Sequence, residues 1–342
     1  MKTRHLVFGL VILIMVLSSC RDITVRTIVN TDGSFTRIVT ISGDSAEAFK
    51  MELPYPVDAS WAMTSKKDSA SKGKFIVSYT KKFRDCEELR AETGKDTSWL
   101  RQLIRPIEIR KRFGFFYSYI DYKETYSKAN PFTALPYEAF VTPDEYLWLI
   151  RRHTIQNPAD SIKSKEAEEK VMTYLIESSI TEVERILSGG IRKLNDPNLD
   201  AIKVGDFHDK FRDAISKWNP KDDEVLIDSL RMWTGNSAVE HLKDIQPPLF
   251  GEFNRKAKFL ENLLMLEAFH VETELPGLIT ATNSTMLNGN RVTWEVFPLA
   301  FLLEDYTMMA QSRVINVWAF IISGLIMLGL ISLLAVKSLR RR

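Results

Sequence analysis

A histidine and two glutamates that alternate along one predicted strand are the best candidates for metal ligands in this chain. His270, Glu272 and Glu274 lie two positions apart, so on a strand their side chains project from the same face. Imidazole and carboxylate groups are common ligands of zinc. Any strand with one solvated face shows the same alternation, however. We therefore interpret the three residues as a solvated polar face, and we predict no metal and no cofactor.

A second group combines two acids with a histidine near the start of a predicted helix. Asp206, His208 and Asp209 could act as an acid/base site, because imidazole transfers protons near neutral pH. The same residues can instead cap the helix and complement its dipole, and we favour this interpretation. Cys86 is the only cysteine besides Cys20. Its acidic neighbours would raise its pKa, so we expect a structural thiol rather than a nucleophile.

The sequence supports neither a calcium-binding loop nor a known catalytic motif. Residues 195–200 are rich in Asn and Asp, but Pro197 and the absence of the required glycine and terminal glutamate break the spacing of an EF-hand. No nucleophile elbow, zinc-protease, phosphate-loop or dinucleotide motif is present. An enzyme would therefore have to use scattered groups that carry no recognisable motif.

Four Asp-Ser-apolar triplets suggest a modification rather than a reaction. They resemble the acceptor for O-glycosylation of exported proteins in Bacteroidetes, and this resemblance implies a bacterium of that kind as the source. Ser161 and Ser229 fall in helical stretches, where the triplet also describes a cap or turn. We therefore predict Ser45 and Ser69 as the candidate O-glycosylation sites, the second in a Ser- and Lys-rich loop.

Residues 20–135 have the pattern of an antiparallel sheet. The β-branched runs 23–29 and 35–41 are joined by Asn-Thr-Asp-Gly, a strong hairpin signal, and strand character returns at 75–83. Residues 104–126 are dense in aromatics and predict one or two long strands. We expect exposed aromatic side chains of this segment to contact a partner; the candidates are Phe113, Phe115, Tyr117 and Tyr119.

Residues 136–267 change to a helical period. Thr142 and Pro143 predict a capped helix start, and residues 163–187 carry apolar residues at helical spacing before Gly189-Gly190, which should end that helix. Shorter helical stretches are predicted at 207–218, 223–233 and 254–266.

Residues 268–312 return to strands. The run 269–275 alternates, and 278–282 should be joined to 291–296 through an Asn-Gly hairpin. We therefore predict the α+β class: an antiparallel β domain built from N- and C-terminal strands, with a helical insertion and one C-terminal transmembrane helix. Two small tandem sheets are the alternative, although each could bury less of its faces.

Both termini carry membrane signals. Lys2 and Arg4 precede an apolar stretch that closes with Leu-Ser-Ser-Cys, so residues 1–19 read as a signal peptide. The closing residues resemble the lipobox of bacterial lipoproteins, which implies cleavage and acylation, for example with palmitate, at Cys20. The alternative is an uncleaved signal anchor, for which 12 apolar residues are short.

The C-terminal segment 313–342 contains 23 uncharged residues, 314–336, enough to cross a bilayer. Lys337 and the three arginines 340–342 follow it, and such clusters stay in the cytoplasm. We therefore expect a cytoplasmic-membrane protein whose C-terminus is cytoplasmic and whose main domain is extracytoplasmic. Without the basic residues of the signal and of the span flanks, 39 Lys and Arg face 44 Asp and Glu, a net charge of −5. This balance argues against nucleic acid as a partner.

The last strands also resemble a known family. Leu275-Pro276-Gly277, Thr282-Asn283, the segment 288–294 and the approach to the span at 306–312 look like the corresponding region of LppM-type membrane-anchored bacterial lipoproteins. The resemblance covers about 40 residues and both anchors, and the helical insertion departs from it. It implies a small α/β module without a known reaction that binds lipids or other envelope components.

The sequence thus favours a non-enzymatic envelope lipoprotein that binds an unknown lipid or protein partner at the outer face of the cytoplasmic membrane. The alternative is a hydrolase-like envelope enzyme with no recognisable motif. An exposed apolar groove would favour binding.

Overall fold

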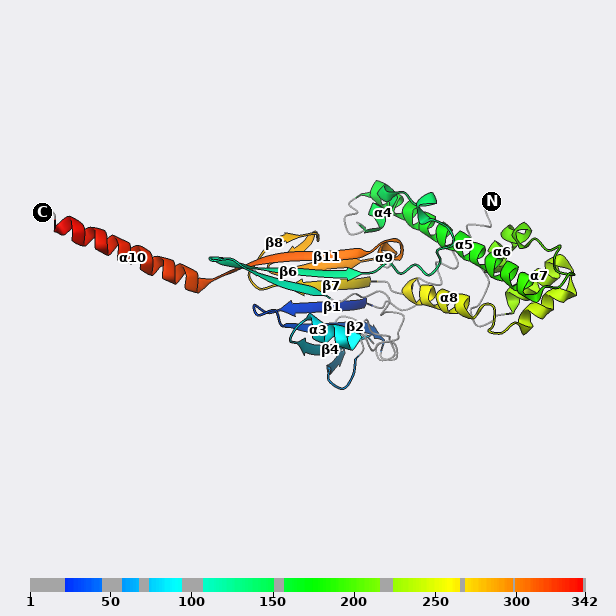
Figure 1. Ribbon diagram of the computed structural model, residues 1–342, viewed down its shortest axis with the longest axis horizontal. Helices are drawn as coiled ribbons and strands as arrows, with labels where there is room; N and C mark the ends of the chain where they lie inside the picture. The colour runs from blue at the N-terminus through cyan, green and yellow to red at the C-terminus, as the bar shows by residue number, and fades with distance from the viewer. Residues whose placement is uncertain are drawn as a thin grey trace. The chain divides into compact units, whose positions relative to one another are not determined.

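The computed structural model describes residues 22–44, 57–67, 74–93, 107–150, 157–215, 224–264, 268–297 and 299–340. Cys20, Ser45 and Ser69 lie outside these residues. The described part of the chain divides into two compact units (Figure 1). One is a β unit within residues 1–127, 268–296 and 305–342, and the other is a helical unit within 128–267 and 297–304. The α+β class, with strands from both ends of the chain and a helical insertion, is confirmed.

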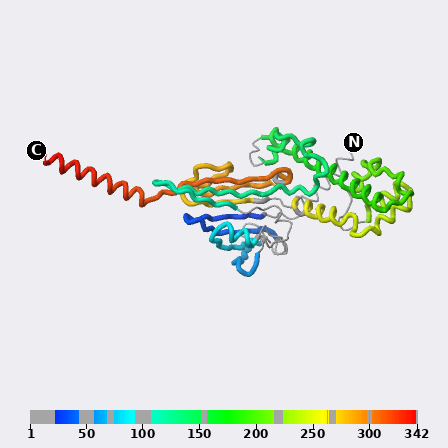
Figure 2. Tube along the Cα trace, viewed as in Figure 1, coloured from blue at the N-terminus to red at the C-terminus, as the bar shows by residue number. Residues whose placement is uncertain are grey.

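The larger sheet of the β unit has seven strands. Its order is β3 (Ala62–Lys67), β4 (Lys74–Phe83), β2 (Phe35–Asp44), β1 (Asp22–Val29), β7 (Ala268–Glu274), β10 (Arg291–Val296) and β9 (Met286–Asn288). The predicted β1–β2 hairpin forms, and the Asp32 carboxylate accepts a hydrogen bond from the Ser34 amide in its turn. β1 and β7 pair in parallel, so strands from the two ends of the chain lie side by side (Figure 2). The other strand pairs of the described residues are antiparallel.

The smaller sheet has four antiparallel strands. Its order is β5 (Glu108–Phe113), β6 (Tyr117–Tyr126), β11 (Tyr306–Ile315) and β8 (Leu278–Thr282). β6 and β11 pair along their whole lengths, from Tyr117 opposite Ile315 to Tyr126 opposite Tyr306. Because β11 ends at Ile315, this central pair leads directly to the helix α10 (Val317–Leu339).

The predicted hairpin between residues 278–282 and 291–296 is wrong. The Asn288-Gly289 turn joins β9 to β10, whereas β8 belongs to the other sheet and pairs with β11. The chain changes sheets at Gly277, whose φ is +85° and where a Cβ atom would lie 2.3 Å from the carbonyl oxygen of Arg313. Only glycine allows such a close approach. Sequence reasoning also missed β3 and the helix α3 (Cys86–Thr93).

The contacts between the two sheets combine aromatic and charged side chains. Trp294 of β10 is 3% exposed, stacks on Tyr122 of β6 and donates a hydrogen bond of 2.9 Å to the Asn283 side chain. Arg37 of β2 and Glu124 of β6 are wholly buried and form an ion pair of 2.5 Å.

The helical unit is built around one long helix. Its members are α4 (Pro143–Ile150), α5 (Pro158–Leu194), α6 (His208–Ile215), α7 (Val225–Thr234), α8 (Gly251–Leu264) and the short α9 (Ala300–Leu303), with 3-10 turns η2 (Tyr137–Ala139), η4 (Val204–Phe207) and η5 (Ser237–Asp244). The predicted start of α4 is confirmed, because Thr142 and Glu145 cap each other reciprocally. Ile180, Val183 and Leu187 of α5 lie in one cluster with buried residues of α6, α7 and α8.

The predicted end of α5 at Gly189-Gly190 is wrong. The helix continues to Leu194, and Asn195 ends it in the left-handed conformation. Gly190 is buried, and a Cβ atom there would lie 3.0 Å from side-chain atoms of Leu242 and of Leu249. Close packing therefore accounts for this glycine.

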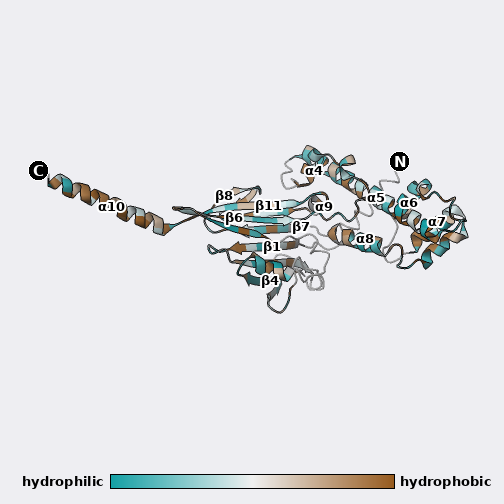
Figure 3. Ribbon diagram, in the orientation of Figure 1, coloured by the Kyte–Doolittle hydropathy of each residue, from teal (hydrophilic) through white to brown (hydrophobic). Residues whose placement is uncertain are grey.

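The helix α10 has the length and composition of a membrane span. It comprises 23 largely apolar residues, and the hydrophobic colour predominates along it, interrupted by paler and teal segments (Figure 3). The chain thus has a C-terminal helix that could anchor it in a membrane.

Candidate functional site

The outer face of the four-stranded sheet carries a surface hollow. Ser118, Ile120, Tyr122 and Glu124 of β6 are buried toward the other sheet, so the alternate residues of β6 project outward. The hollow has a volume of about 570 Å³, and its lining includes Arg110, Arg112, Asp121, Lys123, Met309 and Gln311. We call this surface the outer face.

The charges of the outer face are largely paired with one another. Arg112 donates two hydrogen bonds to Asp121, of 2.7 and 3.1 Å, and Gln311 donates a third, of 2.7 Å. The Arg112 hydrogen bond lowers the pKa of Asp121, with a smaller contribution from Gln311, so this carboxylate stays ionised. The Arg112 guanidinium also lies 5.7 Å from the centre of the Tyr119 ring. The outer face therefore offers fixed polar groups beside an aromatic ring and the exposed Met309.

The turn between β5 and β6, which we call the hairpin tip (residues 113–117), is rich in aromatics. Phe113, Phe115 and Phe116 are 68%, 49% and 40% exposed. Ring contacts join them to the start of α10, where Trp318 lies 6.1 Å from Phe113 and 5.5 Å from Phe115 between ring centres. The structure places Phe113, Phe115 and Tyr117 within the tip and Tyr119 further along β6. Phe116 belongs to the same aromatic run but was not among the predicted partner-binding residues.

Asn316, the residue between β11 and α10, connects the hairpin tip to the helix. Its backbone amide donates to the carbonyl of Phe116 (2.9 Å), and its side-chain amide donates to the carbonyls of Gly114 (2.7 Å) and Phe115 (3.2 Å). Ser118 donates to the Asn316 side-chain oxygen at 3.0 Å. No local sequence pattern signals this residue, because its partners lie about 200 positions earlier.

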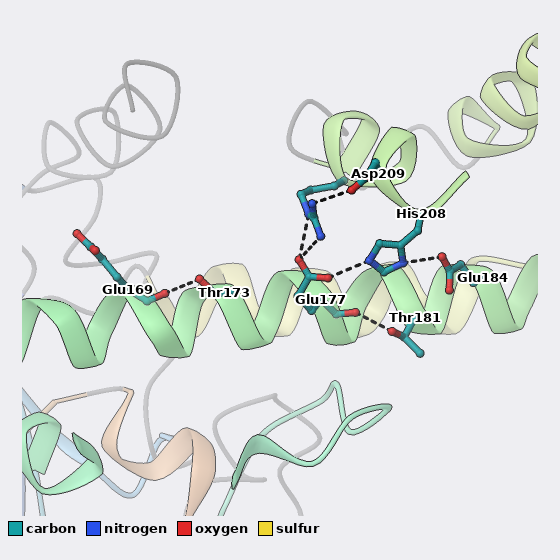
Figure 4. A network of polar contacts seen from close by, with 8 residues as sticks. Glu169, Thr173, Glu177, Thr181, Glu184, His208 and Asp209 are labelled. Carbon is teal, nitrogen blue, oxygen red and sulfur yellow. Dashed lines mark hydrogen bonds and ion pairs between the residues drawn. The ribbon is translucent and has the colours of Figure 1, made fainter. Parts of the chain in front are cut away.

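In the helical unit, His208 lies between two carboxylates of α5. Its Nε2 is 2.9 Å from Glu177 and its Nδ1 is 2.7 Å from Glu184 (Figure 4). Arg212 donates to the other oxygen of Glu177 and to Asp209. Burial lowers the pKa of His208, but the hydrogen bonds and charges of the two glutamates outweigh it, and the pKa is raised. With both ring nitrogens engaged, the imidazolium acts as a structural bridge between α6 and α5.

The remaining chemical candidates are occupied by local interactions. Glu272 and Glu274 form ion pairs with Arg26, at 3.9 and 2.5 Å. Burial is the main cause that raises the pKa of Cys86, with the charge of Asp85 adding to it, and the thiol is disfavoured as a nucleophile. Within the described residues, no group of three or more His, Cys, Asp and Glu side chains could hold a metal ion.

Comparisons with known proteins do not assign the chain to a family. No family model matches the chain, and no curated protein matches it. Among solved structures, the NMR structure of the folded domain of LppM from Mycobacterium tuberculosis is similar over 86% of this chain and 91% of that chain, with 8% identity and a TM-score of 0.27. A TM-score this low does not establish a shared fold, so the functional conclusion depends on this chain's own residues.

Proposed function

We propose that the chain is a non-enzymatic envelope lipoprotein that binds a lipid or protein partner at the extracytoplasmic surface of the cytoplasmic membrane. One observation supports this more than any other. The hollow of about 570 Å³ lies on a sheet whose strand β11 leads into the apolar helix α10. A ligand in the hollow would thus be held close to the membrane that the helix enters.

The chemistry of the outer face supports binding more than catalysis. Binding sites combine apolar and aromatic contact area with a few fixed polar groups. Tyr119 and Met309 supply the contact area, while Arg112, Asp121 and Gln311 hold one another in fixed positions. A carboxylate whose pKa is lowered is a weak base, so Asp121 is better suited to orienting a ligand than to removing a proton from it.

Acylation of Cys20 would add a second anchor. A single acyl chain holds a protein only reversibly, whereas a spanning helix is effectively permanent. The lipid is therefore not needed for retention. Its effect would be to attach the chain to the bilayer at a second point, two residues before β1 begins at Asp22.

A photo-crosslinking experiment tests the binding function. Benzoylphenylalanine is placed at Met309 on the outer face or, as a control, at Met63 on β3 of the other sheet; the two methionines are 48% and 55% exposed. After irradiation of intact cells that make the full chain, mass spectrometry identifies the adducts as lipid or protein.

We expect one recurrent adduct at Met309 that Met63 does not give. The same adduct should be several-fold weaker when Tyr119→Ser removes the neighbouring aromatic ring. Equal labelling at the two methionines, or labelling indifferent to Tyr119→Ser, would count against the outer face as the binding site.

A further inference from the structure

We propose that the hairpin tip is inserted into the interface of the bilayer that α10 spans, so that the partner of its aromatic side chains is the lipid itself. This inference depends on the membrane anchoring in the proposed function. It does not depend on which ligand occupies the outer face.

The first argument is the apolar area that the tip exposes. Phe113, Phe115 and Phe116 are 40% to 68% exposed, and Val317 and Trp318 beside them are 62% and 45% exposed. Contiguous exposed apolar side chains on the surface of a soluble domain mark interaction sites. Aromatic side chains in particular concentrate where a membrane protein crosses between water and hydrocarbon.

The second argument is that the backbone carbonyl groups of the tip already have hydrogen-bond partners within the protein. A turn normally presents carbonyl oxygens to solvent, and moving an unpaired polar group into an apolar medium costs several kcal/mol. Here the carbonyls of Gly114, Phe115 and Phe116 all accept hydrogen bonds from Asn316. One asparagine thus satisfies three groups that would otherwise oppose insertion.

The third argument is position. The rings of Phe113 and Phe115 contact Trp318, and those of Phe116 and Tyr117 lie 4.9 and 5.9 Å from Phe320, between ring centres. Trp318 and Phe320 belong to the first turn of α10, so the tip is at the depth at which that helix enters the membrane.

The basic side chains near the tip lie where lipid headgroups would surround them. The Arg313 guanidinium lies 4.6 Å from the centre of the Tyr117 ring, and Lys111 donates to the carbonyl of Thr31 at 2.7 Å. Long basic side chains at this level keep their charge among the lipid headgroups while their stems cover apolar surface. A bilayer therefore satisfies the aromatics and the cations together. It also covers the apolar surface of α10 that continues from the tip, which is why we choose lipid over a protein partner.

The test measures the depth of the tip in a bilayer. The full chain with Cys20→Ala and Cys86→Ser carries a single cysteine, Phe115→Cys or the control Met63→Cys on β3, labelled with a nitrobenzoxadiazole dye after reconstitution into phosphatidylethanolamine and phosphatidylglycerol vesicles. Phe115 and Met63 have similar exposure, 49% and 55%. Lipids with a nitroxide near the headgroup quench dyes in the interface, and iodide quenches dyes in water. Phe116→Cys is the second reporter if Phe115→Cys fails to accumulate.

We expect the label at Phe115 to be quenched several-fold more by the nitroxide lipid than the label at Met63, and to be protected from iodide. Equal iodide quenching at the two positions would overturn the proposal. Protection from iodide without nitroxide quenching would overturn it as well, because a second copy of the chain would then cover the tip. Vesicle flotation separates these outcomes from a failure of anchoring, in which the chain would not float at all.

Discussion

The side chains of Arg37 and Glu124 place a full ion pair between the two sheets. Arg37 also donates to Thr27, and the Tyr122 hydroxyl donates to Glu124. Burial and the Glu124 carboxylate raise the pKa of Tyr122, so that hydroxyl remains a donor. Such a pair adds little net stability compared with apolar residues, but the loss of one partner leaves a buried charge uncompensated.

Arg37→Met should therefore lower the free energy of unfolding of the β unit by about 3–5 kcal/mol. The double variant Arg37→Met with Glu124→Leu should recover a large part of this loss, because no uncompensated charge remains. Urea unfolding of the full chain in lipid nanodiscs, followed by tryptophan fluorescence, measures both. A double variant less stable than the single one would contradict this account.

His208 should make the stability of the helical unit depend on pH. The groups that face it are Glu177 and Glu184 on α5, with Arg212 and Asp209 on its own helix. Its pKa is raised above the usual 6.5, so the stabilisation is fully present below about pH 6.5. It is lost as the pH rises through the folded-state pKa. Thermal unfolding of the full chain, monitored by circular dichroism, should show this loss, and His208→Gln should abolish it.

Among the elements, α5 shows how two adjacent glycines can have different roles. An added Cβ atom at Gly189 meets nothing within 4 Å, whereas one at Gly190 would lie 3.0 Å from side chains of η5 and of the segment that follows it. The local helix preference is the same at both positions. Only the packing differs, so the pair separates propensity from packing.

Gly189→Ala should raise the free energy of unfolding by about 0.5–1 kcal/mol, because alanine restricts the unfolded chain more than glycine does. Gly190→Ala should gain less or lose stability, and Gly190→Leu should lose more still. Urea unfolding of the helical unit within the full chain, monitored by circular dichroism, provides the comparison. Equal gains at the two positions would refute the packing role of Gly190.

The contrast between local sequence signals and packing against distant residues explains which features the sequence could predict. The β1–β2 hairpin and the start of α4 follow from Asp-Gly and Thr-Pro signals, because both are determined by residues a few positions apart. The continuation of α5 through Gly190 depends on Leu242 and Leu249, and the placement of β8 depends on Gly277 against Arg313. Phe113 and Phe115 were predicted as partner-binding residues from their aromatic character. The hydrogen bonds from Asn316 to Gly114 and Phe115 could not be predicted, because they span about 200 residues.

At the scale of the whole molecule, anchoring is the main expectation to test. We expect α10 to leave the basic C-terminus in the cytoplasm. A reporter active only outside the cytoplasm should then work when inserted near residue 71 and fail when fused after Arg342. Activity of the C-terminal fusion would reverse the proposed orientation.

Removal of the proposed acylation site tests the two anchors separately. Cys20→Ala should abolish incorporation of a labelled fatty acid and leave the chain in the membrane fraction, because α10 alone retains it. A further truncation before Val317 should then release the chain. Release by Cys20→Ala alone would show that α10 does not span the bilayer.

The parallel pairing of β1 with β7 also determines the order in which the β unit can be completed. Asp22 is paired with Ala268, so about 250 residues must be synthesised before β1 finds its second neighbour. At about 5–20 residues per second this takes roughly 10–50 s, during which the open edge of β1 exposes unpaired amide and carbonyl groups. The segments of the helical unit from α4 to α8 are synthesised before β7, so they can fold while the first hairpin waits. The second edge of β1 therefore has no β7 partner until the helical unit has been synthesised.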